Sequence, residues 1–244
     1  MSDSHLVAVW DLVAAHAAAR GRRVTMADVC AVAVSSAQVS GAWVIAASGG
    51  GPDFVMCVSD PVSERLAELQ LTLGEGPCHD VLATGAPVLA RDLDDDQPGH
   101  RWPAFTPEAC QAGAGAVFAF PLTIGVIRAG VLGLYRRSPG SLDSRQLGDS
   151  LLLADTAIVL LLDGVDGTAD GGPAGRPPDL VLHRAEIDQA TGMVMVQVGV
   201  TAAEAFARLR AYAYARDRRL ADVASDIVGR RLRLQPDPPP GGGP

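Results

Sequence analysis

Three adjacent residues, Cys78, His79 and Asp80, have the side chains that nucleophilic catalysis or metal binding requires. A catalytic Cys needs a base that the fold orients toward it, and a metal ion needs three or four converging ligands. Adjacent residues rarely point to one place unless they lie on a loop. His100 or Cys57 could complete such a set, but no spacing rule indicates it. We therefore expect no catalytic residue, no metal and no cofactor. A redox-sensing thiol of low pKa at a helix N-terminus is the alternative for Cys78.

Two further patterns resemble ion or phosphate sites but lack positions that such sites need. Four acidic residues lie close together at Asp92, Asp94, Asp95 and Asp96. They lack the Gly and the distant Glu of a calcium-binding EF-hand loop, so we interpret them as a solvated loop. Gly74 and Gly76 complete neither a dinucleotide-binding fingerprint nor a P-loop.

Arginine and tyrosine alternate near the C-terminus in a combination that is typical of nucleic-acid-binding surfaces. The interleaved residues are Tyr212, Tyr214, Arg216, Arg218 and Arg219. Unpaired RNA bases stack on such rings and guanidinium groups. The alternative is that the tyrosines are half-buried helix residues with solvated hydroxyl groups.

The charge of the chain is divided unevenly. Residues 179–235 hold nine Arg against seven Asp or Glu, a net charge of +2, whereas residues 1–178 hold eleven Arg against twenty acids, a net charge of −9. The more basic surface therefore belongs to the C-terminal part, where it would attract RNA. A net charge of +2 does not by itself indicate RNA binding.

Three helices in close succession are predicted for residues 182–234. The second begins with a capping box, in which Thr201 and Glu204 each satisfy an otherwise unpaired amide. The third buries apolar residues between Leu220 and Val228 at helical spacing. It ends in the basic residues of 229–233, which also suit the negative end of a helix dipole.

Apolar residues at heptad-like spacing could form a dimer seam in two predicted helices. In the first C-terminal helix these residues are Leu180, Ile187 and Val194. The alternative is an ordinary amphipathic helix that packs on its own domain. A long helix over residues 143–162 has a second stripe, formed by Leu147, Leu151, Ala154 and Ile158.

Residues 182–234 resemble the ANTAR domain, a three-helix RNA-binding module of bacterial antitermination regulators. The matching residues are Ala190, Gly192, Met195, Ala205, Phe206, Leu209, Arg210, Leu220, Val223, Ala224 and Ile227. The resemblance implies binding to a pair of hairpins in nascent leader RNA. The candidate RNA contacts are Arg184, Arg208, Arg210, Tyr212, Arg216, Arg218 and Arg219. Many members carry Lys where this chain has Thr191. The chain has no Lys, so the contact of that Lys is missing or is supplied by an Arg.

The N-terminal part alternates between helix and strand patterns. Helices are predicted over residues 5–19, 25–38, 60–69, 76–83 and 143–162. Strands are predicted over residues 42–47, 54–59, 87–93, 116–124 and 129–136, with hairpin turns at residues 49–52 and at Gly125. This order predicts an α+β fold in which helices cover an antiparallel sheet.

Several strings in this part resemble a GAF domain of the kind found next to ANTAR domains. They are LGEGPC at residues 73–78, RWPAF at 101–105, VFAFPL at 117–122 and GVLGLYR at 130–136. The resemblance covers residues 5–162 and implies a small-molecule pocket between the sheet and the segments that join its third and fourth strands. The candidate pocket residues are Cys78, His79, Trp102, Phe118 and Phe120. The alternative is that these side chains fill a core.

Length, composition and charge exclude several classes of protein. A chain of 244 residues, 48% of them hydrophobic, can form one large or two modest domains with well-formed cores. A net charge of −8 argues against a general nucleic-acid coat and against binding to anionic membranes. The N-terminus lacks the pattern of a secretory signal, and the most apolar run, residues 151–162, is too short to span a bilayer. Four cysteines without a C-x-x-C pair suit reduced cytosolic thiols better than a disulfide framework.

The predicted organisation has four segments. They are a GAF-like sensor domain over residues 5–163, a Gly/Pro-rich linker over 164–178, an ANTAR-like RNA-binding domain over 179–235 and a disordered tail over 236–244. The protein is then a cytoplasmic, non-enzymatic regulator that responds to a signal, binds leader RNA hairpins as a homodimer and promotes transcription antitermination. Two alternatives are a ligand sensor that acts through a protein partner of its helical bundle, and a GAF-like half that turns over its ligand.

Overall fold

The computed structural model divides the chain into two compact units, Met1–Pro177 and Pro178–Pro244. It describes residues 3–47, 53–94, 101–166 and 178–235. Most of the predicted linker and the whole predicted tail at 236–244 lie outside the described residues, as do His100, Asp95 and Asp96. Residues 164–166 of the predicted linker are helical.

The N-terminal unit is built on a five-stranded antiparallel sheet with the strand order β2-β1-β5-β4-β3. The strands are β1 (Gly41–Ala46), β2 (Phe54–Val58), β3 (Val88–Ala90), β4 (Ala116–Ile124) and β5 (Ile127–Arg136). The hairpins β1–β2 and β4–β5 pair as the sequence predicts, and the long central strand β5 joins them. The predicted α+β class is therefore confirmed.

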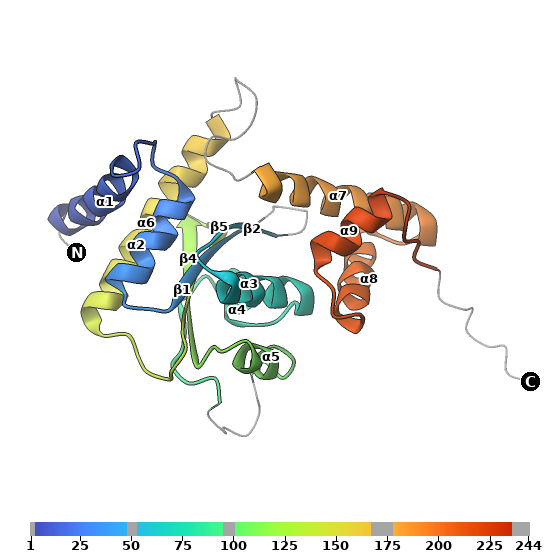
Figure 1. The fold of residues 1–244 in the computed structure, drawn as a ribbon, viewed down its shortest axis with the longest axis horizontal. Helices are drawn as coiled ribbons and strands as arrows, with labels where there is room; N and C mark the ends of the chain where they lie inside the picture. Colours follow the sequence, from blue (N-terminus) through green and yellow to red (C-terminus); the bar gives the residue numbers. More distant parts are fainter. Residues whose placement is uncertain (1–2, 48–52, 95–100, 167–177, 236–244) are drawn as a thin grey trace, which may run out of the picture. The chain divides into compact units, whose positions relative to one another are not determined.

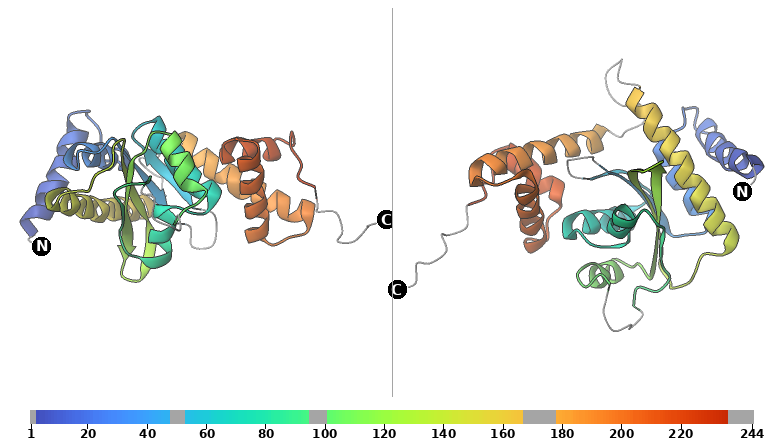
Figure 2. Two further views of the ribbon diagram at one scale, coloured as in Figure 1. Left: turned by 90° about the horizontal axis from the view of Figure 1, so that it is seen from below. Right: turned by 180° about the vertical axis from the view of Figure 1, so that it is seen from behind.

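Helices cover both faces of this sheet, as Figures 1 and 2 show. On one face lie α1 (Asp3–Ala18), α2 (Met26–Ser36) and α6 (Ser144–Asp166); on the other lie α3 (Pro61–Leu73), α4 (Pro77–Thr84) and α5 (Phe105–Gln111). The sequence did not predict α5. It has seven residues with Pro107 among them, too few for a helical apolar period to be recognised.

Two separate cores result, because successive residues of a strand point to opposite faces of a sheet. The face toward α2 and α6 buries what we call the α2–α6 core, including Val44, Phe118, Phe120, Leu132 and Leu134. The opposite face buries the α3–α5 core, including Trp43, Ile45, Val117, Val131 and Tyr135. The central strands are consequently apolar at nearly every position, as in a sheet without a solvated face.

The apolar stripe of α6 belongs to the α2–α6 core. Ala154 and Ile158 are buried against the sheet, and Leu147 and Leu151 pack against the same core. This stripe therefore faces its own sheet, which matches an amphipathic helix of a single domain. Among the α6 side chains that the structure describes, the exposed large apolar ones are instead Val159 and Leu162.

Two of the four cysteines form a disulfide, so the expectation of four reduced thiols was wrong. Cys30 of α2 and Cys57 of β2 meet in the α2–α6 core and are bonded to each other. Their spacing of 27 residues carries no motif, since the packing of a helix on a strand brings them together. Closing a loop of this length stabilises a fold by about 3–4 kcal/mol in the chain-entropy description.

The C-terminal unit consists of α7 (Pro178–Val198), α8 (Ala202–Ala215) and α9 (Leu220–Val228). The predicted capping box of α8 is confirmed: the Glu204 carboxylate accepts from Thr201 N at 2.9 Å, and Thr201 Oγ1 accepts from Glu204 N at 3.3 Å. The helices enclose a core, the bundle core, that contains Ala190, Val194, Ala205, Leu209, Ala213, Leu220, Val223, Ala224 and Ile227. Val194, one of the heptad-spaced residues, is therefore used inside its own unit.

We predict that Gly133→Ala destabilises the N-terminal unit by about 1–3 kcal/mol, the usual cost of overfilling a core. Gly133 of β5 pairs with Trp43 of β1, and a Cβ at this glycine would overlap the buried indole ring. Chemical denaturation measures the change. Gly148→Ala in α6 is the control, because its Cβ would meet no atom within 4 Å and Ala favours a helix. Equal stability of Gly133→Ala and the wild type would contradict the prediction.

Candidate functional sites

The turn between α3 and α4 carries Cys78 into the α3–α5 core. The chain leaves α3 at Gly74 in a left-handed conformation with φ of 69°. At Gly76, φ is 124° and a Cβ would overlap the Gln70 side chain, so this position requires glycine. Gln70 is buried, and its Oε1 accepts a hydrogen bond from Cys78 N at 2.7 Å. The turn thus fixes Cys78 deep inside the N-terminal unit.

The side chains of Cys78, His79 and Asp80 do not converge. Cys78 is 1% exposed in the α3–α5 core, whereas His79 is exposed. The Asp80 carboxylate accepts from Arg101 Nε at 2.7 Å and from Trp102 Nε1 at 3.1 Å. Among the described residues, no three His, Cys, Asp or Glu side chains come together as metal ligands would.

The environment of Cys78 favours a protonated thiol. Burial raises its pKa to about 12, and the side chains of Trp43 and Gln70 offset only part of this rise. A thiol with this pKa is almost entirely neutral near pH 7 and is a poor nucleophile. The low-pKa alternative for Cys78 was therefore wrong, because its position at a helix start is outweighed by burial in apolar surroundings.

Two carboxylates hold the segment of residues 101–105 against the α3–α5 core. Glu75 Oε1 accepts from the backbone N–H groups of Ala104 and Phe105, each at 2.6 Å, and so satisfies the start of α5. Asp80 holds Arg101 and Trp102 as described above. The strings LGEGPC and RWPAF are thus tied together by Glu75, a residue to which the sequence analysis gave no role.

The same face contains a buried donor without an oxygen or nitrogen acceptor. Trp43 is fully buried, and within the described residues its Nε1 has no acceptor other than the weak one that the neighbouring Cys78 thiol offers. The ring lies over Gly133, where no side chain competes for space. An unpaired buried N–H costs about 1–3 kcal/mol, and a stronger acceptor at this position would lower that cost.

The candidate pocket residues fall into three locations. Cys78 and Trp102 join Trp43 in the α3–α5 core. Phe118 and Phe120 lie in the α2–α6 core, on the opposite face of the sheet, and His79 is at the surface. Strand alternation predicts that Phe118 and Phe120 share a face, but the sequence contains no signal that tells which helices cover it.

Two arginines of the C-terminal unit are supported by aromatic rings. Arg210 Cζ lies 5.6 Å from the Phe206 ring centroid, and Arg216 Cζ lies 5.3 Å from that of Tyr212. Arg210 is half-buried, and burial lowers its pKa. Arg216 is exposed and Tyr212 is half-buried. The Tyr212–Arg216 pair therefore presents a charged, planar group at the surface.

Arg218 is held by an acidic residue of α9. Arg218 Nη2 donates to Asp226 Oδ2 at 2.6 Å, and Arg231 Nε donates to Asp226 Oδ1 at 2.7 Å. The hydrogen bonds from Arg218 and Arg231 lower the pKa of Asp226, so its carboxylate stays charged at neutral pH. Arg231 lies beyond the residues that the sequence analysis selected as RNA contacts.

The other candidate RNA contacts are spread over the three helices. Arg208 is partly exposed on α8, and Arg219 is exposed at the start of α9. Arg184 lies on α7, but its side chain is outside the described residues. Thr191, at the position where many ANTAR domains carry Lys, is 6% exposed and donates its hydroxyl hydrogen to Ile187 O at 2.8 Å. Thr191 therefore offers no group to a partner.

No single helix of the described segments combines the length and the apolarity needed to cross a membrane. The bent pair Ala185–Val198 and Ala202–Ala215 meets these criteria only when its two helices are taken together.

Comparison with protein families assigns both units. The N-terminal unit is a helix-covered antiparallel sheet, and the C-terminal unit consists of three helices. Residues 15–161 match the GAF domain, and residues 181–228 match the ANTAR domain. The chain belongs to the GAF family and carries an ANTAR domain after its GAF domain. GAF domains are sensor domains, and ANTAR domains are RNA-binding modules of antitermination regulators.

Solved structures agree with the fold of the N-terminal unit. The GAF domain of a phosphoenolpyruvate-protein phosphotransferase from Coxiella burnetii is 13% identical with a TM-score of 0.52, over 69% of this chain and 99% of that chain. The GAF domain of the corresponding Acinetobacter protein is 12% identical with a TM-score of 0.48, over 70% of this chain and 100% of that chain. Because its sequence identity is only 13%, the Coxiella burnetii structure supports the fold and nothing beyond it. A comparison with curated proteins found no match.

We predict a defined order of cysteine alkylation. In the folded protein without reductant, iodoacetamide at pH 8 should modify Cys110, which is partly exposed, long before Cys78. Cys78 should react after unfolding, and Cys30 and Cys57 only after unfolding and reduction. Intact-mass and peptide mass spectrometry count the labels. Rapid labelling of native Cys78, or four labels on unfolded protein without reductant, would contradict the assignment.

Proposed function

We propose that this protein is a signal-responsive cytoplasmic regulator that binds hairpins in nascent leader RNA and promotes transcription antitermination. The observation that carries the proposal is the coincidence of the ANTAR match with a three-helix unit that has its own core and exposed arginines. Binding the hairpins would disfavour a competing terminator hairpin and let transcription continue. Neither unit is proposed to catalyse a reaction.

The proposed RNA contacts are arginines at the surface of the bundle. Arg216, stacked on Tyr212, fits a role in contacting bases of a hairpin loop, since guanidinium and aromatic planes stack on unpaired bases. Arg208, Arg218 and Arg219 supply charge for backbone phosphates. Arg210 is half-buried against Phe206 and would act partly by holding α8 in shape. Arg184 on α7 extends this proposed set.

A homodimer is the form in which we propose that the regulator acts. Two ANTAR bundles on one dimer would bind two neighbouring hairpins with an avidity that one bundle lacks. A signal would control the protein by favouring one of two arrangements of this dimer. Because the stripe of α6 packs against its own sheet and Val194 of α7 is buried in the bundle core, the contact would use other residues, such as Val159 and Leu162.

We predict that replacing Arg208, Arg216 and Arg219 together with Gln reduces the RNA recovered by crosslinking in cells and flattens the salt dependence of binding by purified protein. The loss of three cationic contacts should lower the slope of log affinity against log salt by about two to three. Sequencing of the crosslinked RNA should show leader segments with two adjacent hairpins that overlap a terminator. Unchanged RNA recovery and unchanged affinity in a folded variant would show that these three arginines do not contact RNA.

The rival proposal is a docking bundle for a protein partner. The test uses wild-type protein and the isolated residues 178–235, both expressed and folded. If neither recovers RNA above background, a docking bundle for a protein partner is favoured. RNA binding by residues 178–235 alone would count against it.

We further propose that the signal is a small molecule that binds between the sheet and α3–α5. The Trp43 N–H supports this, because within the described residues it has no acceptor beyond the weak sulfur of Cys78, and an acceptor atom of a ligand would satisfy it. Cys78 and Trp102 share that core and would contact the same molecule. Of the other pocket candidates, Phe118 and Phe120 lie on the opposite face of the sheet and His79 lies at the surface. These three residues would therefore influence the ligand only indirectly.

The corresponding prediction concerns Trp43→Phe, which keeps an aromatic ring and removes the N–H donor; the smaller ring leaves part of the indole space empty, so each compound is compared with the same protein without compound. Compounds that raise the melting temperature of wild-type protein in a screen of small hydrogen-bond acceptors should lose most of this effect on the variant. Loss of one hydrogen bond should weaken binding by roughly tenfold. Trp102→Phe in the same screen reports on the neighbouring ring. Equal responses of Trp43→Phe and wild type would place the ligand elsewhere.

A further inference from the structure

The positive charge of the C-terminal unit is concentrated at its end. Residues 218–235 hold five Arg and two Asp, a net charge of +3, whereas residues 179–217 hold four Arg and five acids, a net charge of −1. Three of the five arginines, Arg230, Arg231 and Arg233, follow residue 228, where the ANTAR match ends. The family match therefore does not account for the most basic part of the unit.

These residues are fixed by hydrogen bonds to the end of α9. Arg230 has a left-handed backbone conformation with φ of 57°, which turns the chain back. Arg231 N and Leu232 N then both donate to the carbonyl oxygen of Asp226, at 2.7 and 3.1 Å. Leu232 and Leu234 pack against the bundle core. The basic residues thus alternate with apolar anchors on a folded turn.

Asp226 also joins two arginines through its side chain. One carboxylate oxygen binds Arg218, which precedes α9, and the other binds Arg231, which follows it. The side chains of Arg218 and Arg231 remain 37% and 62% exposed. Each guanidinium has five N–H donors, so donors remain for a further acceptor, and the three groups together keep one positive charge.

We propose that the Asp226-bridged pair of Arg218 and Arg231, with the exposed Arg230 and Arg233, forms a clamp for backbone phosphates of RNA. This inference rests on the proposed RNA-binding function. Guanidinium groups recognise phosphate oxygens through paired, charge-assisted hydrogen bonds, and two of them held by one carboxylate are oriented before the RNA arrives. Asp226 is a positioning residue, which sets the direction of the two guanidinium groups without contacting RNA.

The first test replaces Arg230, Arg231 and Arg233 together with Gln in the full-length protein. The probe is the RNA segment most enriched in the crosslinking experiment, and fluorescence anisotropy measures its affinity over a range of salt concentrations. We expect binding to weaken by on the order of tenfold or more, and the slope of log affinity against log salt to fall by about two to three.

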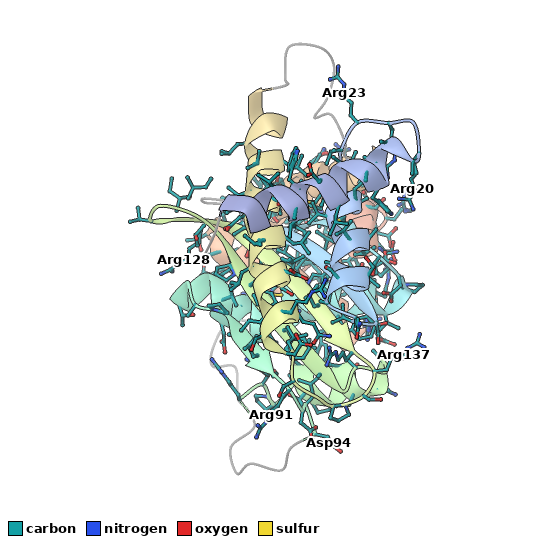
Figure 3. All side chains as sticks on the ribbon, turned by 90° about the vertical axis from the view of Figure 1, so that its left-hand side faces the viewer. Arg20, Arg23, Arg91, Asp94, Arg128 and Arg137 are labelled. Atoms are coloured by element: carbon teal, nitrogen blue, oxygen red, sulfur yellow. A yellow bond between two sulfur atoms is a disulfide. The ribbon has the colours of Figure 1, made fainter. Side chains whose placement is uncertain are left out.

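The control variant replaces Arg23, Arg91 and Arg137 with Gln. These arginines are exposed in the N-terminal unit and are labelled in Figure 3. The control makes the same change in net charge, and its affinity should equal that of the wild type. If wild-type protein binds the RNA and the two triple variants behave alike, the clamp is overturned while the proposed function stands. If wild-type protein binds no RNA, both are overturned.

The second test is Asp226→Asn, because positioning and simple attraction predict opposite results. The substitution removes one negative charge, so attraction alone would tighten RNA binding. If Asp226 positions the arginines, binding weakens by about threefold to tenfold although the protein has become more positive. Asp222→Asn, on the same helix, removes an equal charge that also acts on Arg218 but removes no hydrogen bond of the bridge, and should leave binding equal or tighter. Thermal melting by circular dichroism shows whether each variant is folded. Tighter binding of folded Asp226→Asn than of the wild type would overturn the positioning role.

Discussion

Burial of the central sheet on both faces is the constraint on which the N-terminal unit depends. The strands of such a sheet carry apolar side chains on both faces. Each face therefore needs a layer of helices to cover it, and each layer encloses a core of its own. The layers then differ in what they contain. One has the two longest helices of the unit, α6 and α1, and the disulfide, and the other has its two shortest helices, α4 and α5, and the tight turn at Gly74 and Gly76. The regular layer supports the sheet, while the irregular layer holds the groups that the proposed ligand site would use.

Carboxylates act as organisers in both units of this acidic protein. Glu75 satisfies the start of α5, Asp80 holds an arginine and an indole, and Asp226 holds two arginines and, through its carbonyl group, the turn after α9. In each case a short, irregular segment without enough apolar surface of its own is fixed by charge-assisted hydrogen bonds. Such segments are where binding residues usually lie, since regular elements leave few polar groups free.

Much of the architecture could be predicted from the sequence, because it depends on local rules. Strand alternation, the capping box at Thr201 and the turn glycines identify the elements and their order. The misses have another origin. The pairing of Cys30 with Cys57, the face that receives Phe118 and the depth of Cys78 depend on which helices cover which side of the sheet. That choice is made by packing over the whole unit, and a few adjacent residues do not encode it. The role of Glu75 was missed for the same reason, since the backbone N–H donors that its carboxylate accepts from lie about thirty residues away along the chain.

The contact between Trp43 and Gly133 has a consequence for how the sequence can change over evolutionary time. One position supplies a large ring and its cross-strand neighbour supplies the empty space, so neither can vary alone without overlap or a void. Among related proteins the two positions should therefore vary together: a side chain at the position of Gly133 should accompany a smaller residue at that of Trp43. The indole donor would be lost in such relatives although the fold is preserved, and with it the group on which the proposed ligand site depends.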